Sequence, residues 1–138
     1  MNIVLDANIL FSALIRDSTT RRMILEYDDR FLFPTYIFEE LEKHKAELIR
    51  KSCLNEDEFN QLLSMLLRKV SVVPNEVLYP CQKEAYEAVK DIDRDDVLFV
   101  ACVLAYPNSI LWSDDKKLKK IKHVTVLNTK EIIDLLAP

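Results

Sequence analysis

Acidic side chains follow two of the short apolar segments of this sequence. Asp6 comes directly after apolar residues 3–5, and Asp114 and Asp115 come directly after the segment 110–113. If both segments are buried parallel strands, their carboxyl ends lie at one edge of a sheet, where sites form in open α/β folds. The sequence therefore predicts that these carboxylates lie close together at that edge.

Two further segments offer carboxylates to the same edge. Asp95 and Asp96 precede the apolar run 97–106, which reads as a buried helix, and Glu40 lies in the second turn of another predicted helix. Carboxylates held close together repel one another, and hard divalent cations such as Mg²⁺ or Mn²⁺ relieve that repulsion because they prefer oxygen ligands. Such ions orient water and stabilise charge that develops on phosphorus, so phosphodiester hydrolysis is the reaction that fits.

Most of these carboxylates also have a purely structural explanation. Asp95 and Asp96 are good helix caps, Asp114 and Asp115 suit a turn, and Glu40 has acidic neighbours that are typical of a solvated helix face. Asp6 is the hardest to explain in this way. Its surroundings are almost wholly apolar, no basic residue precedes Arg16, and a buried charge needs a partner.

Composition excludes several other classes of protein. The chain of 138 residues contains no glycine, so it has neither a Walker loop nor a dinucleotide-binding fingerprint. Its three cysteines and two histidines are scattered and do not form a zinc site. The longest apolar run is too short to span a bilayer and no signal peptide is evident, so we expect a cytoplasmic protein with a single domain over residues 1–138.

The net charge of −4 does not suggest a protein that merely coats nucleic acid. Positive charge is gathered in two places, and each reads by itself as a solvated face. With a cation bound to the carboxylates, these groups could line the approach of an RNA backbone. The predicted RNA contacts are Arg16, Arg21, Arg22, Lys116 and Lys117.

Predicted strands alternate with predicted helices along the whole chain. We expect strands at 2–5, 31–33, 70–73, 110–113 and 124–127, and helices at about 9–15, 19–27, 35–51, 56–69, 81–90, 96–106 and after Asn128. Pro34 is expected in the first turn of the third helix. This order predicts an α/β fold, with a parallel twisted sheet of about five strands and helices on both faces.

Four pieces of the sequence resemble the PIN-domain family. They occur in the family's order and extend over most of the chain, and in this sequence they read Val4-Leu5-Asp6-Ala7-Asn8-Ile9-Leu10, Phe38-Glu39-Glu40-Leu41, Asp95-Asp96-Val97-Leu98-Phe99-Val100-Ala101 and Trp112-Ser113-Asp114-Asp115-Lys116-Lys117-Leu118. The resemblance implies a nuclease core that cuts single-stranded RNA with Mg²⁺ or Mn²⁺.

The resemblance also implies roles for individual residues. The residues expected to hold the metal ions or activate water are Asp6, Glu40, Asp96 and Asp115. Asp96 is preferred to Asp95 because its distance of five residues from Ala101 matches the family's Asp-x-x-x-x-Ala pattern. Asp115 is preferred to Asp114 because, with Ser113, it matches the family's Ser-x-Asp spacing. Asn8 is expected to support the cluster by hydrogen bonding, Ser113 to position it, and Asp93 to lie in an outer shell.

The same resemblance suggests partners. Many short PIN proteins are toxins with a cognate antitoxin, so we expect single-stranded or structured RNA, an antitoxin protein and a second copy of the chain. One alternative is a PIN-like interaction module without catalysis. Another is a phosphatase with Asp6 as nucleophile, but that chemistry usually has an acidic residue two positions on, where this sequence has Asn8.

Overall fold

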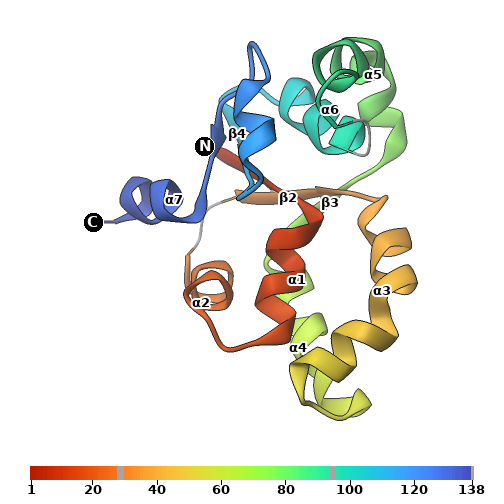
Figure 1. Cartoon of the computed structure of the whole chain (residues 1–138), viewed down its shortest axis with the longest axis vertical. Coiled ribbons are helices and arrows are strands. Elements are labelled where there is room, and N and C mark those ends of the chain that lie inside the picture. Colours follow the sequence, from red (N-terminus) through yellow and green to blue (C-terminus); the bar gives the residue numbers. More distant parts are fainter. Residues whose placement is uncertain (28–29, 94–95, 138) are drawn as a thin grey trace.

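A parallel β-sheet lies at the centre of the computed structural model, which describes residues 1–27, 30–93 and 96–137 (Figure 1). Within these residues the strand order is β3-β2-β1-β4-β5. In the central register, Val4 lies opposite Leu32 on one side and Leu111 on the other. The strands are β1 (Asn2–Leu5), β2 (Arg30–Pro34), β3 (Val70–Val73), β4 (Ser109–Trp112) and β5 (Val126–Leu127). The predicted α/β fold with a five-stranded parallel sheet is confirmed.

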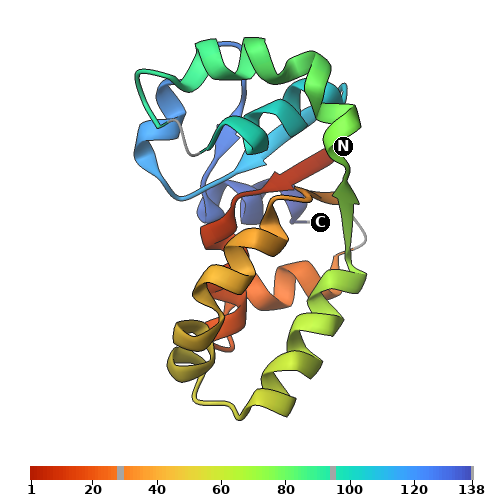
Figure 2. The ribbon, with the colours of Figure 1, turned by 90° about the vertical axis from the view of Figure 1, so that its right-hand side faces the viewer.

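Helices cover both faces of this sheet (Figures 1 and 2). On one face lie α5 (Asn75–Val89) and α6 (Val97–Ala105). On the other lie α1 (Ala7–Ile15), α2 (Thr19–Glu26), α3 (Ile37–Ser52) and α4 (Glu56–Arg68). A short 3₁₀ helix, η2 (Lys116–Lys120), follows β4, and α7 (Thr129–Leu136) follows β5.

The burial of the central elements explains why their sequences are continuously apolar. A parallel strand covered on both faces has no polar side, and residues 3–5 of β1 are fully buried. Helix α6 contacts β1, β2 and β4 and buries residues 99–103. Among the residues that the structure describes, none of the helices combines the length and the apolar character needed to cross a membrane.

Several predicted boundaries differ from the structure, most of them by one or two residues and the start of α5 by six. Pro34 is the last residue of β2, opposite Val73, and does not lie in a helical turn. Its missing N–H is not needed for pairing with β3, because the N–H of Thr35 donates to the carbonyl of Val73 at 3.0 Å. Helix α5, predicted at 81–90, begins at Asn75 and contains Pro80, although proline disrupts helix interiors. Strand β5 is shorter than predicted and pairs with β4 over two residues.

The order of the strands fixes where a site can form. From β1 the chain builds outward through β2 and β3, and then crosses to the other side of β1 to add β4 and β5. The direction of growth reverses between β1 and β4, and a crevice opens beyond the carboxyl ends of strands at such a reversal. Asp6 directly follows β1 and Ser113 directly follows β4, so both lie at this point.

Candidate metal centre

Asp6 is a buried carboxylate at the junction of β1 and α1. It is only 4% exposed. Its Oδ1 accepts a hydrogen bond from the backbone N–H of Ile9 at 2.9 Å, so it caps α1, and it also accepts one from the Ser113 side chain. Its own backbone N–H donates to the carbonyl of Trp112 at 3.2 Å. These bonds hold the carboxylate rigidly against the end of β4.

Three further aspartates converge beside Asp6. Asp93, Asp96 and Asp115 are each half-buried, and one carboxylate oxygen from each lies within 4.8 Å of the others. Asp93 and Asp96 come from the connection between α5 and α6, where the Asp96 N–H donates to the Asp93 carbonyl at 3.3 Å. Asp96 is at the N-cap position of α6, but its side chain makes no capping hydrogen bond. Helix capping therefore does not account for this carboxylate.

Burial and mutual repulsion raise the pKa values of two of these groups. Burial raises the pKa of Asp6 to about 6, against the hydrogen bonds from Ser113 and Ile9 that lower it. Burial, together with the charge and a hydrogen bond of the neighbouring Asp93 carboxylate, raises the pKa of Asp96 to about 7. In both cases the protein disfavours the ionised form that a metal ligand needs.

The chemistry of this donor set fits a hard divalent cation. All four side chains offer oxygen, which Mg²⁺ and Mn²⁺ prefer. Within the described residues, no lysine or arginine forms an ion pair with Asp6, Asp96 or Asp115. The repulsion among the carboxylates is thus not relieved by the protein's own cations, and a bound metal ion would relieve it.

The four aspartates line a cleft of about 690 Å³, and Glu40 lies in the same cleft. Among the described residues, Asp6 is not one of the three carboxylates that meet most closely, and neither is Glu40. Its Oε1 accepts a hydrogen bond from the Tyr36 hydroxyl, and its Oε2 lies 3.5 Å from Nε2 of His44. It therefore stands at the α3 side of the cleft, held by two neighbours of its own helix and the preceding turn.

The other predicted residues of the site are placed as follows. Asn8 is exposed and lines the cleft, and the described residues include no hydrogen-bond partner for its side chain. Ser113 is 1% exposed and also accepts a hydrogen bond from the backbone N–H of Asp115 at 3.1 Å. Asp114 lies outside the cleft lining and accepts from the backbone N–H and hydroxyl of Thr129 at 2.8 and 2.9 Å. Asp95 lies outside the described residues.

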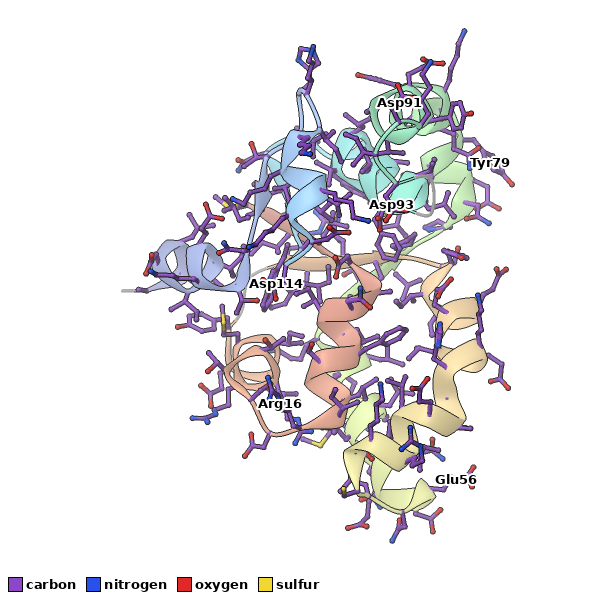
Figure 3. The ribbon with its side chains drawn as sticks, viewed as in Figure 1. Arg16, Glu56, Tyr79, Asp91, Asp93 and Asp114 are labelled. Atoms are coloured by element: carbon purple, nitrogen blue, oxygen red, sulfur yellow. The ribbon has the colours of Figure 1, made fainter. Side chains whose placement is uncertain are left out.

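The basic residues predicted to contact RNA do not line this cleft in the described chain. Arg21 donates from Nε to the carbonyl of Ala13 at 2.7 Å and so satisfies the end of α1. Arg22 lies 4.0 Å from Asp17, and Arg16 lies at the end of α1 away from the sheet (Figure 3). Lys116 and Lys117 are exposed on η2. The basic residues that do line the cleft are Lys43, His44 and Lys51.

Sequence reasoning gave Asp93 only an outer position, although it belongs to the close group. The available signal was its spacing of only three residues before Asp96, which keeps the two carboxylates close together along the chain. Lys43 and His44 were missed for a different reason. They follow Glu40 by three and four residues, so they lie on the same face of α3, and that helical spacing could have placed them beside the carboxylates.

A comparison with known proteins identifies the family of this chain. The sequence model of the PIN domain matches residues 4–133, which is nearly the whole chain. No curated protein matches the sequence. The match begins within β1, before Asp6, and extends beyond Asp115. The chain therefore belongs to the PIN-domain family.

Proposed function

We propose that this protein is a metal-dependent endoribonuclease that hydrolyses phosphodiester bonds of single-stranded RNA. One observation carries the proposal, namely the meeting of Asp6, Asp93, Asp96 and Asp115 in one cleft without a lysine or arginine ion pair to Asp6, Asp96 or Asp115 among the described residues. Membership of the PIN-domain family supports nuclease chemistry at this position.

Asp6, Asp93, Asp96 and Asp115 would hold Mg²⁺ or Mn²⁺. When bound, such an ion lowers the pKa of water and stabilises the charge that develops on the phosphoryl oxygens. The water oxygen attacks phosphorus, the bond from phosphorus to one ester oxygen breaks, and that oxygen takes up a proton. The chain's part in this reaction would be to hold its carboxylates fixed and close together, while the bound cation favours their ionised form.

The hydrogen bonds around Asp6 and Glu40 determine how precisely these carboxylates are held. Asp6 is fixed by the N–H of Ile9 and by Ser113, so its carboxylate has little freedom of rotation. Glu40 is bonded by Tyr36, lies beside His44 and lines the same cleft as the aspartates. We assign Glu40 a part in ligation or in accepting the proton of the attacking water, with Asn8 nearby as a donor to substrate or water.

The resemblance to short PIN toxins supports a finer proposal about biological role. We propose that the protein acts as the toxin of a toxin–antitoxin pair in the cytoplasm and that it forms a homodimer. Light scattering on the purified chain tests the dimer, because a monomer at all accessible concentrations would contradict it.

The central test is cleavage of single-stranded RNA by the wild-type protein and by Asp6→Asn, with and without chelator. The variant keeps the shape of the side chain and removes its charge, so Mn²⁺-dependent cleavage is abolished while the fold survives. Asp134→Asn is the matched control, because Asp134 is an exposed aspartate of α7 that is remote from the cleft lining. Undiminished cleavage by Asp6→Asn would refute the proposal.

Two further measurements separate the alternatives. A folded protein that takes up no Mn²⁺ in calorimetry at millimolar concentration would favour an interaction module without catalysis. Hydrolysis of a chromogenic phosphate monoester in preference to an RNA oligonucleotide would favour a phosphatase. A cleavage map on total RNA, made with and without chelator, then identifies the preferred substrate.

A further inference from the structure

The cleft continues away from the aspartates, along the groove between α1 and α3. This arm of the cleft is lined by Phe11 and Ile15 of α1 and by Lys43, His44, Glu47 and Lys51 of α3. Lys43, Glu47 and Lys51 are spaced by four residues, so they follow one face of α3. From Lys43 to Lys51 this face extends about 12 Å along the helix axis.

The charge of this arm is concentrated on Lys43. Lys51 lies 3.1 Å from Glu47, and Arg50 lies 3.8 Å from the same carboxylate oxygen, so Glu47 is satisfied by cations of its own helix. Lys43 is exposed and forms no ion pair within the described chain. It follows Glu40 by three residues, so an ammonium group that is free to bind phosphate lies one helical turn from the Glu40 carboxylate.

Aromatic rings line the same cleft as this lysine. Phe11 and His44 are half-buried, with ring centroids 5.5 Å apart and planes inclined by 61°. Tyr36 and Phe99 form a second pair, with centroids 6.5 Å apart, but Phe99 is buried and offers no stacking face. A basic group beside partly exposed rings is the combination that binds a single strand, because the cation contacts phosphate and the rings contact unpaired bases.

We infer that the groove between α1 and α3 seats the RNA strand on one side of the cleaved bond, with Lys43 on a phosphate and the Phe11–His44 pair against a base. The inference rests on the proposed function and extends it to the substrate. It replaces the predicted contacts at Arg16, Arg21, Arg22, Lys116 and Lys117, none of which lines the cleft. The groove selects an unpaired strand because its rings need bases that are free to stack.

The test compares two lysines of the same helix. Lys43 lines the cleft, whereas Lys45 does not and lies 3.9 Å from Glu56. Binding of a fluorescein-labelled oligouridylate is measured by anisotropy at several salt concentrations, with chelator present so that no cleavage occurs. We expect Lys43→Ala to weaken binding about fivefold and to reduce the slope of log affinity against log salt by about 0.7, as loss of one phosphate contact requires. Lys45→Ala serves as the unchanged control.

Rescue and kinetics complete the design. Lys43→Arg restores the salt slope because it restores the charge, and in Mn²⁺ the loss in Lys43→Ala falls on KM more than on kcat. Phe11→Leu keeps the apolar volume of the groove but removes the ring, so it weakens binding without altering the salt slope. Equal affinity and salt slope for Lys43→Ala and Lys45→Ala would overturn the inference.

The outcome is separable from that of the proposed function. A wild-type protein that cleaves RNA but shows no difference between the two lysine variants keeps its nuclease assignment and loses this binding groove. A wild-type protein that binds the oligouridylate through Lys43 but never cleaves it keeps the groove and loses the nuclease assignment.

Discussion

Helices α4 and α6 begin in opposite ways. At the start of α4, Asn55 accepts a hydrogen bond from the N–H of Glu58 at 2.8 Å, and the Glu58 carboxylate accepts one from the N–H of Asn55 at 3.1 Å. At the start of α6, Asp96 occupies the same position and makes no such bond. The first site is exposed to solvent and locally satisfied, whereas the second is half-buried among like charges.

The difference teaches how to recognise a functional carboxylate. An aspartate at an N-cap has a local structural role available, and the structure at α4 shows what fulfilling such a role looks like. The Asp96 side chain makes no capping hydrogen bond and instead lies close to Asp93 and Asp115, where the carboxylates repel one another. Proteins break a local rule in this way mainly at functional sites. Asp6 is intermediate, because its carboxylate caps α1 and also lines the cleft with Asp93, Asp96 and Asp115.

The sharpest test of this contrast is Asp96→Asn. Cleavage of single-stranded RNA in Mn²⁺ should fall by roughly 100-fold or more, because the amide cannot supply the charge that a divalent cation requires. The melting temperature of the metal-free protein at neutral pH should hold or rise, since the substitution removes a buried charge and no capping bond is lost. A variant that cleaves normally and melts lower would show that Asp96 is an ordinary cap and would break the comparison.

The pH dependence of stability follows from the raised pKa values. In the unfolded chain both aspartates titrate near 3.8, whereas in the metal-free folded protein Asp6 titrates at about 6 and Asp96 at about 7. Between these values the folded state binds more protons than the unfolded state, so stability falls as pH rises through this window. We expect the metal-free protein to melt roughly 5 °C lower at about pH 8 than at about pH 5 because of these groups.

The difference between wild type and Asp96→Asn isolates the contribution of Asp96 to the pH dependence of stability, since the other groups titrate in both proteins. Melting curves recorded by calorimetry should give a flatter dependence on pH for the variant. Addition of Mn²⁺ should raise the melting temperature of the wild type most at the higher pH, because protons then compete least for the carboxylates. A wild type that gains stability above neutral pH without metal would contradict the proposed burial of repelling charges.

Much of the fold was predictable because its signals are local. The strand at 2–5 and the helix starts after Asn55 and Asn128 each depend on a few neighbouring residues, and all three stand where they were predicted. The boundary of α5 was not predictable in this way. Pro80 is disfavoured inside a helix by its own chemistry, and only the packing of α5 against α6 accounts for a helix that continues through it.

The site was predictable only in part, for a related reason. Strand order brings Asp6 and Asp115 to one edge of the sheet, and that follows from the alternation of strands and helices. The position of Asp93 depends on the turn before α6, and the basic residues of the cleft depend on which face of α3 meets α1. The distribution of charge along the sequence predicts neither the position of Asp93 nor which basic residues line the cleft. Arg21 looked available for RNA, yet its guanidinium satisfies the carbonyls of Ala13 and Leu14.

The smallest expected effect belongs to the other helix of the comparison. Asn55→Ala removes the oxygen that accepts from Glu58 and leaves that N–H to water, so it should lower the free energy of unfolding by about 1 kcal/mol, as cap removal usually does. Urea denaturation measures this as a lower midpoint with an unchanged slope. Cleavage should be unaltered, because Asn55 is exposed and does not line the cleft.

Asn55 and Asp96 occupy the same position at the start of their helices. If Asn55→Ala lowers only stability and Asp96→Asn lowers only cleavage, the two residues serve different purposes at that position. A fall in activity for Asn55→Ala comparable to that for Asp96→Asn would mean that the helix ends communicate and that position alone does not distinguish them.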